Sequence, residues 1–417
     1  MRTRPTATTP TLLSPRARVV AAAAAPWTVF LAATCLRPAL TSVGPLLPTI
    51  GDAMHLSESR QGLLGALPLV AFALVSPFVH RFSRSFGGEW CVLAALLVLA
   101  AGCVVRSYTG SAGLWVGTLV IGTAIAFGNV LVPVLVKREF PTRISRATSI
   151  YTAGIVVFAS LAAVVAVPLA MATEWRFALA VWGVQAVIIA VAWFPRARAS
   201  GVAAWSEADD AHDQHPSVWR QPTAWLLTAF MGLQSTAFYV FVTWLPTIEI
   251  STGVSAGTAG VHLFIFQLAG LAGGLSIPVL LRGTHSQVTG AVAASVPMLF
   301  ATLGLLAVPD LVLLWAVVAG FGQGCALVVA LSLIGMRGRT PHETTQLSGM
   351  AQSVGYLLAA AGPVAAGALA EHTGGWNATL VLTAVLSLVQ ILVAFGAGRD
   401  HRPPLAPYAS SIASPNA

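Results

Sequence analysis

The stretch AGLWVGTLVIGTAIAFGNVLVPVLV, residues 112–136, contains no charged side chain. An α-helix rises 1.5 Å per residue, so about 20 apolar residues cross the roughly 30 Å hydrocarbon core of a bilayer. The stretch therefore predicts a membrane-spanning helix. A second apolar run, residues 89–107, comes just before it, and similar runs recur along the whole chain.

Twelve such runs form two sets of six. The expected spans are residues 22–47, 61–80, 89–107, 112–136, 148–170 and 176–195 in the first set, and 223–248, 257–281, 288–308, 311–335, 347–370 and 377–396 in the second. We predict an all-α integral membrane protein of twelve transmembrane helices in two six-helix pseudo-repeats. Its parts are a tail at 1–21, a bundle at 22–195, a linker at 196–222, a second bundle at 223–396 and a tail at 397–417.

The composition fits a protein whose main solvent is lipid. Hydrophobic residues make up 56% and charged residues 9% of the 417 residues, and the mean hydropathy is +0.80. Soluble proteins carry charge on about a quarter of their residues. The net charge of +8 does not indicate nucleic-acid binding, because the basic residues are dispersed between apolar runs. The four cysteines all lie in apolar runs, and we assign them no chemistry.

The basic residues predict the orientation in the membrane. If the N-terminus is cytoplasmic, eighteen of the 22 Lys and Arg residues fall in cytoplasmic segments, and only Arg60, Arg106 and Arg176 fall outside. The positive-inside rule therefore places both termini and the linker in the cytoplasm. Within the linker, His212 and His215 could bind a metal, but a plain solvated linker explains the composition better, and we expect no metal and no cofactor.

Repetition supports the division into two halves. Leu-Pro-Thr-Ile closes the first expected span at residues 47–50 and the seventh at residues 245–248. The following helices also correspond, with Ser76-Pro77 and Arg81 at nearly the same offset from Ser276, Pro278 and Arg282. Parallel repeats of this kind predict a solute site between the halves.

Arg37 is the one basic residue that this topology leaves inside a span. It lies about 11 to 15 residues into its helix, or roughly 16 to 22 Å, and a charge at that depth is usually retained for function. Thr34 and Thr41 share its face at i−3 and i+4. All acidic residues are assigned to loops, so the solute itself is the expected counter-charge, and a guanidinium suits carboxylate-like anions. The alternative is a structural arginine bonded to carbonyls and amides of neighbouring helices.

Uncharged polar side chains in other spans complete the expected site, either by lining the cavity or by bridging helices. They are Asn129, Gln234, Tyr239, Gln323, Gln352 and Tyr356, with Ser235 and Gln267 beside them. Gln352 and Tyr356, at i and i+4 next to Ser348, form the most convincing stripe after Arg37.

His262 lies near the expected outer end of the eighth span and is the candidate for proton coupling, because histidine titrates near neutrality. With no carboxylate expected in the spans, a hydrogen-bonded structural histidine is the alternative.

Four segments resemble the cyanate permease and 2-nitroimidazole transporter family of the major facilitator superfamily. They are LRPALTSVGP at 36–45, GNVLVPVLVKR at 128–138, GLQS at 232–235 with Phe238-Tyr239 and Trp244-Leu245-Pro246, and LSGMAQSVGYL at 347–357. The resemblance covers both halves. It implies the major facilitator fold, an inner-membrane location in a bacterium and alternating access for small planar or anionic solutes.

One loop departs from the superfamily pattern. The usual segment after the second helix, Gly-x-x-x-Asp-Arg-x-Gly-Arg-Arg, is FVHRFSRSFG at residues 78–87 and lacks the Asp. A charge relay through that Asp is not expected, but Arg81 and Arg84 remain as candidates for a gating loop.

These features predict a secondary active or facilitative transporter that moves a small, anionic or planar polar solute across the cytoplasmic membrane. The alternative is a drug or metabolite efflux pump of the same superfamily with broad, apolar substrates. No catalytic pair lies in the spans, so an enzyme is not expected. The expected partners are the solute, a coupling proton or counter-solute, and membrane lipid, and we expect a monomer without nucleic acid.

Overall fold

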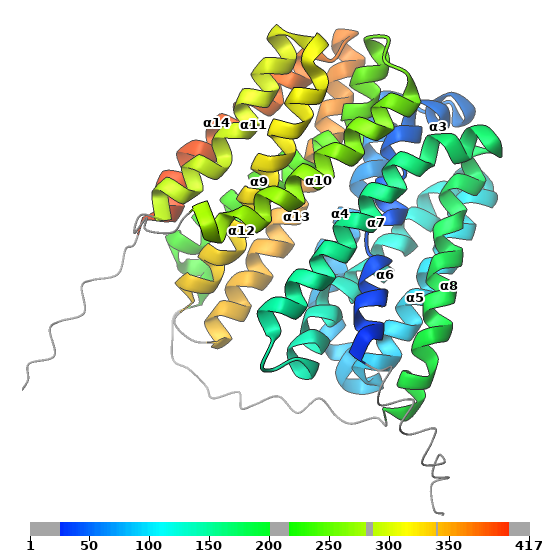
Figure 1. Ribbon diagram of the computed structural model, residues 1–417, viewed down its shortest axis with the longest axis vertical. Helices are drawn as coiled ribbons and strands as arrows, with labels where there is room; N and C mark the ends of the chain where they lie inside the picture. The colour runs from blue at the N-terminus through cyan, green and yellow to red at the C-terminus, as the bar shows by residue number, and fades with distance from the viewer. Residues whose placement is uncertain (1–25, 201–216, 281–286, 339–340, 400–417) are drawn as a thin grey trace, which may run out of the picture.

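The computed structural model describes residues 26–200, 217–280, 287–338 and 341–399, apart from a few side chains within them. Every regular element in these ranges is helical (Figure 1). The first half comprises a helix over residues 26–34, α2 (Pro38–Thr41), η1 (Gly44–Leu46), α3 (Leu47–Met54), α4 (Glu58–Phe86), α5 (Gly88–Tyr108), α6 (Gly110–Glu139), α7 (Ile144–Ala172) and α8 (Trp175–Ala199). The second half comprises η2 (Val218–Arg220), α9 (Pro222–Ser251), α10 (Ala256–Leu280), α11 (Gln287–Ala307), η3 (Pro309–Leu311), α12 (Val312–Arg337), α13 (Pro341–Thr373) and α14 (Asn377–Gly398).

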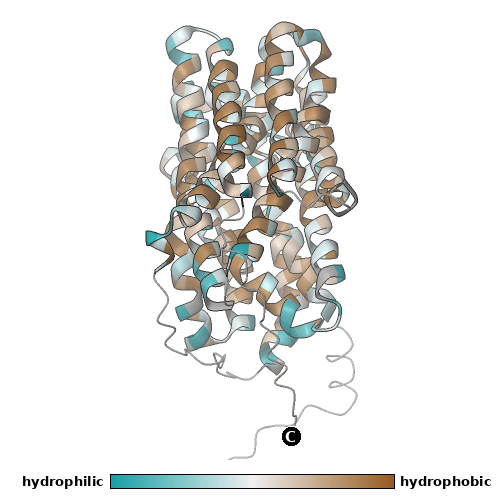
Figure 2. Cartoon of the chain, turned by 90° about the vertical axis from the view of Figure 1, so that its left-hand side faces the viewer, coloured by the Kyte–Doolittle hydropathy of each residue, from teal (hydrophilic) through white to brown (hydrophobic). Residues whose placement is uncertain are grey.

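Twelve helical segments of the described chain are long and apolar enough to cross a membrane. Large apolar side chains, such as Met171, Val191 and Phe300, are exposed on their outer faces, and hydrophilic residues gather toward the two ends of the bundle (Figure 2). A surface of this kind suits hydrocarbon, where each helix satisfies its own backbone hydrogen bonds. The predicted all-α membrane fold with twelve spans is confirmed.

The first span differs most from its predicted form. It runs over Pro26–Met54 as three α-helices and a short 3₁₀ helix instead of one helix over 22–47. Leu-Pro-Thr-Ile does not close the span, because it begins α3; in the second half the same four residues lie inside α9, which continues to Ser251. The expected start at residue 22 and the two tails lie outside the described residues.

The two halves meet along two helix pairs, α4 with α13 and α7 with α10. We call the end of the bundle where α8 ends and α9 begins the linker end, and the opposite end the far end. At the far end a Cβ on Gly62 of α4 would collide with the carbonyl of Pro363 in α13, and one on Gly260 of α10 would press on the carbonyl of Ala163 in α7. Glycine permits this close approach. The halves are therefore in direct backbone contact at the far end.

A hydrogen-bonded contact reinforces the far-end closure. The Ser59 hydroxyl at the start of α4 donates to Glu371 Oε2 of α13 over 2.5 Å, and the Ser59 amide donates to the same oxygen over 3.1 Å. Glu371 is exposed and Ser59 is half-buried, so the contact adds little stability but marks where the halves touch.

Candidate substrate site between the halves

Arg37 occupies the break in the first span. The helix over residues 26–34 ends just before it, and α2 begins after it with Pro38, which lacks an N–H donor. A second proline, Pro45, lies in η1 seven residues further on. Regular helical hydrogen bonding is therefore interrupted near both prolines. The Arg37 side chain, at this interruption, points toward the second half.

The guanidinium of Arg37 meets the second half at α9. Its Nη1 donates a hydrogen bond to the Tyr239 hydroxyl over 2.5 Å, and its Cζ lies 5.9 Å from the centre of the Tyr239 ring. The Tyr356 hydroxyl of α13 lies close to the same guanidinium, and the Tyr356 ring packs edge-on against Phe72 of α4 at 5.8 Å. One cation of the first half thus faces two phenols of the second half.

A small cavity lies beside this contact. Its volume is about 30 Å³, room for about two water molecules. Arg37, Thr41, Tyr239 and Thr243 supply its polar lining, and the other lining residues are apolar or glycine, Phe238 among them. A solute larger than water fits only when the halves separate.

Only one of the two predicted threonines lies beside Arg37: Thr41 follows it by one helical turn and lines the same cavity, whereas the helix is broken between Thr34 and Pro38. The Thr34 hydroxyl donates to the Leu31 carbonyl over 2.7 Å and accepts from Gln185 of α8 over 3.0 Å. The Thr41 hydroxyl donates to the Ala159 carbonyl of α7 over 2.8 Å. Thr41 lines the cavity, whereas Thr34 joins the first span to α8.

The predicted amides are spread over the bundle. Gln234 is buried and donates to its neighbour Ser235 over 2.7 Å. Gln352 is half-buried and donates to the Ser348 hydroxyl over 2.9 Å. Both residues of this predicted stripe belong to α13, so the hydrogen bond stays within one helix. Asn129 of α6 is half-buried. None of these three lines the small cavity.

Two further glutamines occupy the second half. Gln267 of α10 donates across the halves to the Ala159 carbonyl over 3.4 Å. Gln323 of α12 is buried, and its Oε1 has no hydrogen-bond partner in the described structure. Gln267 and Thr41 therefore donate to the same carbonyl, that of Ala159. Gln323 has an unsatisfied side-chain oxygen and does not line the cavity beside Arg37.

Arg106 was expected in an outer loop and is instead buried, with 1% of its surface exposed. Its Nη1 donates to the Ala39 carbonyl over 2.6 Å and its Nη2 to the Leu179 carbonyl over 3.2 Å. In a regular helix the Val43 amide would donate to the Ala39 carbonyl. Here it donates to the Leu40 carbonyl, which leaves the Ala39 carbonyl available to Arg106. Arg106 thus supports the broken span two residues from Arg37, and the expectation that Arg37 is the only charge buried in the spans is wrong.

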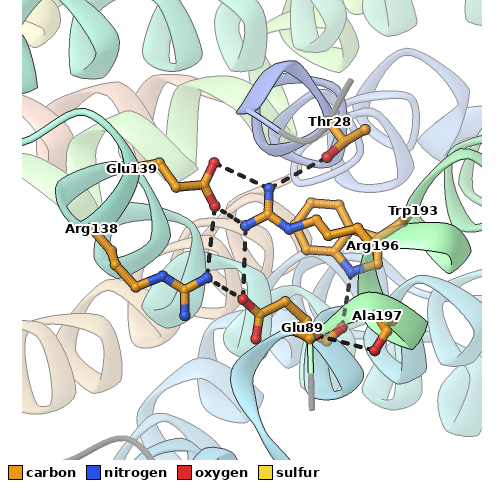
Figure 3. Close-up of polar contacts among 8 residues, drawn as sticks. Thr28, Glu89, Arg138, Glu139, Trp193, Arg196 and Ala197 are labelled. Atoms are coloured by element: carbon orange, nitrogen blue, oxygen red, sulfur yellow. Dashed lines mark hydrogen bonds and ion pairs between the residues drawn. The ribbon is translucent and has the colours of Figure 1, made fainter. Parts of the chain in front are cut away.

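A charged cluster at the linker end was also missed by sequence reasoning (Figure 3). Arg138 pairs with Glu89, and Arg196 pairs with Glu139, while Arg196 and Glu89 lie 3.9 Å apart. Arg196 also packs over the Trp193 ring, 4.5 Å from its centre. Arg196 was predicted to belong to the solvated linker, but α8 continues to Ala199 and carries it into the bundle. The cluster joins the ends of α5, α6 and α8.

The expectation that no carboxylate lies in the spans is also wrong. Glu249 belongs to the last turns of α9, and 1% of its surface is exposed. Its Oε2 lies 2.6 Å from His262 Nδ1 of α10. The predicted proton-coupling histidine therefore has a buried acidic partner, which was overlooked because Glu249 lies close to the end of an apolar run.

The predicted gating arginines lie on a helix, because α4 continues to Phe86. Arg81 and Arg84 are both exposed in its last turns at the linker end. Within the described ranges, no three His, Cys, Asp or Glu side chains gather as a metal site, and His212 and His215 lie outside those ranges.

Comparisons with known proteins agree with this architecture. A family model described as Major Facilitator Superfamily matches residues 29–335. The chain is 39% identical to the 2-nitroimidazole transporter of Escherichia coli K12 over 393 residues, 94% of this chain and 98% of that protein. It is 30% identical to the cyanate transport protein CynX of the same organism over 350 residues, 82% of this chain and 88% of that protein.

A solved structure, the inward-facing, occupied form of a bacterial homologue of the human lysosomal transporter Spinster, shares the fold. Its TM-score is 0.72 at 14% identity, covering 92% of this chain and 97% of that one. The family model and the two relatives identify a transporter rather than an enzyme, and the twelve apolar helices make it a multi-pass inner membrane protein. The chain belongs to the major facilitator superfamily, in the family of the 2-nitroimidazole and cyanate transporters.

Proposed function

We propose that this transporter moves a small, planar anion or polar solute by alternating access, and that Arg37 binds the solute between the halves. The observation that carries the proposal is the hydrogen bond from Arg37 to Tyr239 across the halves, with the Tyr356 hydroxyl close to the same guanidinium. A guanidinium offers five donors, more than two phenols can use, so donors remain for carboxylate-like oxygens. The names of the 2-nitroimidazole and cyanate relatives fit a solute of this size and shape.

The surrounding side chains suit a flat guest. Phe238 and Tyr239 line the cavity, and the Tyr356 ring lies close by. Aromatic faces stack on planar solutes, while the arginine fork fixes an anionic edge. Tyr239 and Tyr356 belong to the second half, so a bound solute would connect both halves through Arg37.

The cycle follows from the contacts between the halves. The far end is closed by backbone contacts at Gly62 and Gly260, and the central cavity holds only about two waters. We take the linker end as cytoplasmic, with both termini inside, so this structure corresponds to closure toward the outside. Separation at the far end would admit solute from the other side, with the protein acting as a monomer surrounded by lipid.

Purified wild type and Arg37→Gln protein test the proposal. We expect benzoate, cyanate or 2-nitroimidazole to raise the melting temperature of the wild type and to be transported into proteoliposomes. Losing one partner of a buried charged contact costs about 2–5 kcal/mol, so Arg37→Gln should weaken solute binding on the order of 100-fold. The melting temperature without solute should stay close to that of the wild type.

The exposed Arg60→Gln variant is the matched control, because it removes the same charge from the surface. Unchanged transport in Arg37→Gln would make Arg37 a structural residue and contradict the proposal. Transport of many apolar drugs, insensitive to Arg37, would favour the alternative efflux pump.

A further inference from the structure

Glu249 and His262 form an isolated ionisable pair in the second half. Glu249 Oε2 lies 2.6 Å from His262 Nδ1, while Glu249 Oε1 is buried without a hydrogen-bond partner in the described structure. The Glu249 side chain is 1% exposed and the His262 side chain 12% exposed. A buried carboxyl group with an unsatisfied oxygen is costly, so such a group usually has a role beyond stability.

No other titratable side chain of the described elements contacts this pair. Among the neighbours, α14, η1 and the far-end parts of α7 and α12 carry none. The titratable side chains of α3, η3 and the far-end parts of α4 and α13 lie at the far-end surface. They are Asp52, His55, Glu58, Arg60, Asp310, Glu371 and His372. None of them makes a printed hydrogen bond or ion pair with Glu249 or His262, so any proton taken up here belongs to the pair itself.

The geometry allows a proton relay. When His262 carries its proton on Nδ1, that N–H donates to Glu249 and Nε2 is free to accept a proton. A proton arriving at Nε2 lets Nδ1 pass its own proton to Glu249 Oε2, which leaves a neutral histidine and a neutral carboxyl group. One proton has entered, and the net charge of the pair has risen from −1 to zero.

The pair lies next to the contact that closes the far end. His262 is two residues from Gly260, which packs on the Ala163 carbonyl of α7 in the first half. Gln267 of the same helix donates to the Ala159 carbonyl of α7. Opening the far end must separate α10 from α7 here and bring water toward His262.

The pair is also mechanically connected to the solute site. Glu249 and Tyr239 share α9 and are ten residues apart, or about 15 Å along the helix. A movement of α10 against α9 thus acts on the helix that holds the hydroxyl opposite Arg37.

We propose that Glu249 and His262 are the proton-binding pair that couples proton movement to transport. The proposal rests on the proposed transport function. A neutral pair tolerates burial better than one with a net negative charge, so proton binding from the far side favours closure of the far end, and the coupled proton then leaves toward the linker end once that end opens.

Transport in proteoliposomes separates coupling from solute binding. The probes are benzoate, cyanate and 2-nitroimidazole, each tested in exchange without a pH gradient and in accumulation driven by a pH gradient. We expect Glu249→Gln to keep exchange within about threefold of the wild type and to lose gradient-driven accumulation at least about tenfold. Asp310→Asn, an exposed carboxyl group at the same end, should change neither.

A wild type protein that exchanges the probes but ignores the pH gradient would overturn the proposal, as would a Glu249→Gln variant that still accumulates them. If no probe is transported by the wild type, the proposed function fails instead, and the proton site is still tested by spectroscopy. Infrared difference spectra between acid and alkaline pH should show a protonated carboxyl band that disappears in Glu249→Gln.

His262→Gln covers the case in which Glu249→Gln does not fold. It removes the relay but keeps the carboxyl group, so the infrared band should remain while gradient-driven accumulation falls. An unchanged gradient response in His262→Gln, or no carboxyl band in the wild type, would contradict the relay.

Discussion

The first span and α9 occupy equivalent places in the two halves but fold differently. Their Leu-Pro-Thr-Ile segments begin at residues 47 and 245, an offset of 198 residues. With that offset, Pro38 and Pro45 of the first span correspond to Thr236 and Thr243 of α9. The first span breaks into three α-helices and a short 3₁₀ helix, whereas α9 is continuous over 30 residues.

The first helix of each half therefore has a different role. Near the prolines of the first span the helical hydrogen bonding is interrupted: the Val43 amide donates to Leu40, and the Ala39 carbonyl left free is satisfied by Arg106. Arg37 lies in that break as the cation of the site. Thr236 keeps its N–H, and its hydroxyl donates to the Gly232 carbonyl over 2.8 Å, so α9 is an unbroken helix where it holds Tyr239. A broken helix carries the charge, and a continuous helix presents the hydroxyl.

Breaking α9 at the equivalent point should have the largest effect. Thr236→Pro removes a backbone donor and places a ring against the carbonyl of Gly232, at a cost of about 3 kcal/mol inside a helix. We expect a loss of about that size in unfolding free energy, measured in mixed detergent micelles, together with loss of transport because Tyr239 follows one turn later. Thr236→Ala keeps the backbone donor and is the control. Equal stability of the two variants would show that α9 tolerates a break.

Removing the support of the broken span should have the next largest effect. Arg106→Gln is too short to reach both carbonyls, and leaving the buried Ala39 carbonyl unpaired costs about 1–3 kcal/mol. We expect a lower unfolding free energy by that amount and weaker solute binding, read by thermal shift with and without the probe. Arg60→Gln should leave both unchanged. Normal stability of Arg106→Gln would mean that water satisfies the carbonyl.

Removing the hydroxyl that faces Arg37 should have the smallest effect. Tyr239→Phe keeps the ring but loses one hydrogen bond, worth about 1 kcal/mol, so solute affinity should fall about fivefold with little change in stability. Binding isotherms of the probes measure this, and Tyr108→Phe, at the exposed end of α5, is the control. A loss as large as that in Arg37→Gln would mean that the tyrosine, not the arginine, makes the main contact.

Local patterns account for what could be predicted. Runs of about 20 apolar residues predict spans because a helix must cross a fixed hydrocarbon thickness. Eleven of the twelve predicted spans fall within a few residues of the observed ones, and the first does not. Arg37 stood out because it lies far from either end of its run. Pro38 and Pro45 were visible as kinks, but the sequence did not show that they would divide the span.

The burial of charged residues near the ends of apolar runs could not be predicted in the same way. Arg106, Arg196 and Glu249 each lie within a few residues of a helix end, where a long side chain can reach water or turn inward. Their burial depends on partners from other helices: the carbonyls of Ala39 and Leu179, the acids of α5 and α6, and His262.

The sequence by itself determined the membrane class, the twelve spans, the family resemblance and the unusual position of Arg37, because hydropathy, proline and motif are properties of neighbouring residues. Only the tertiary structure decided that Arg37 meets Tyr239, that Arg106 holds the broken span, and that Glu249 joins His262. These pairs unite residues 202, 67 and 13 positions apart, and the free energy of each depends on which helices exclude water around it.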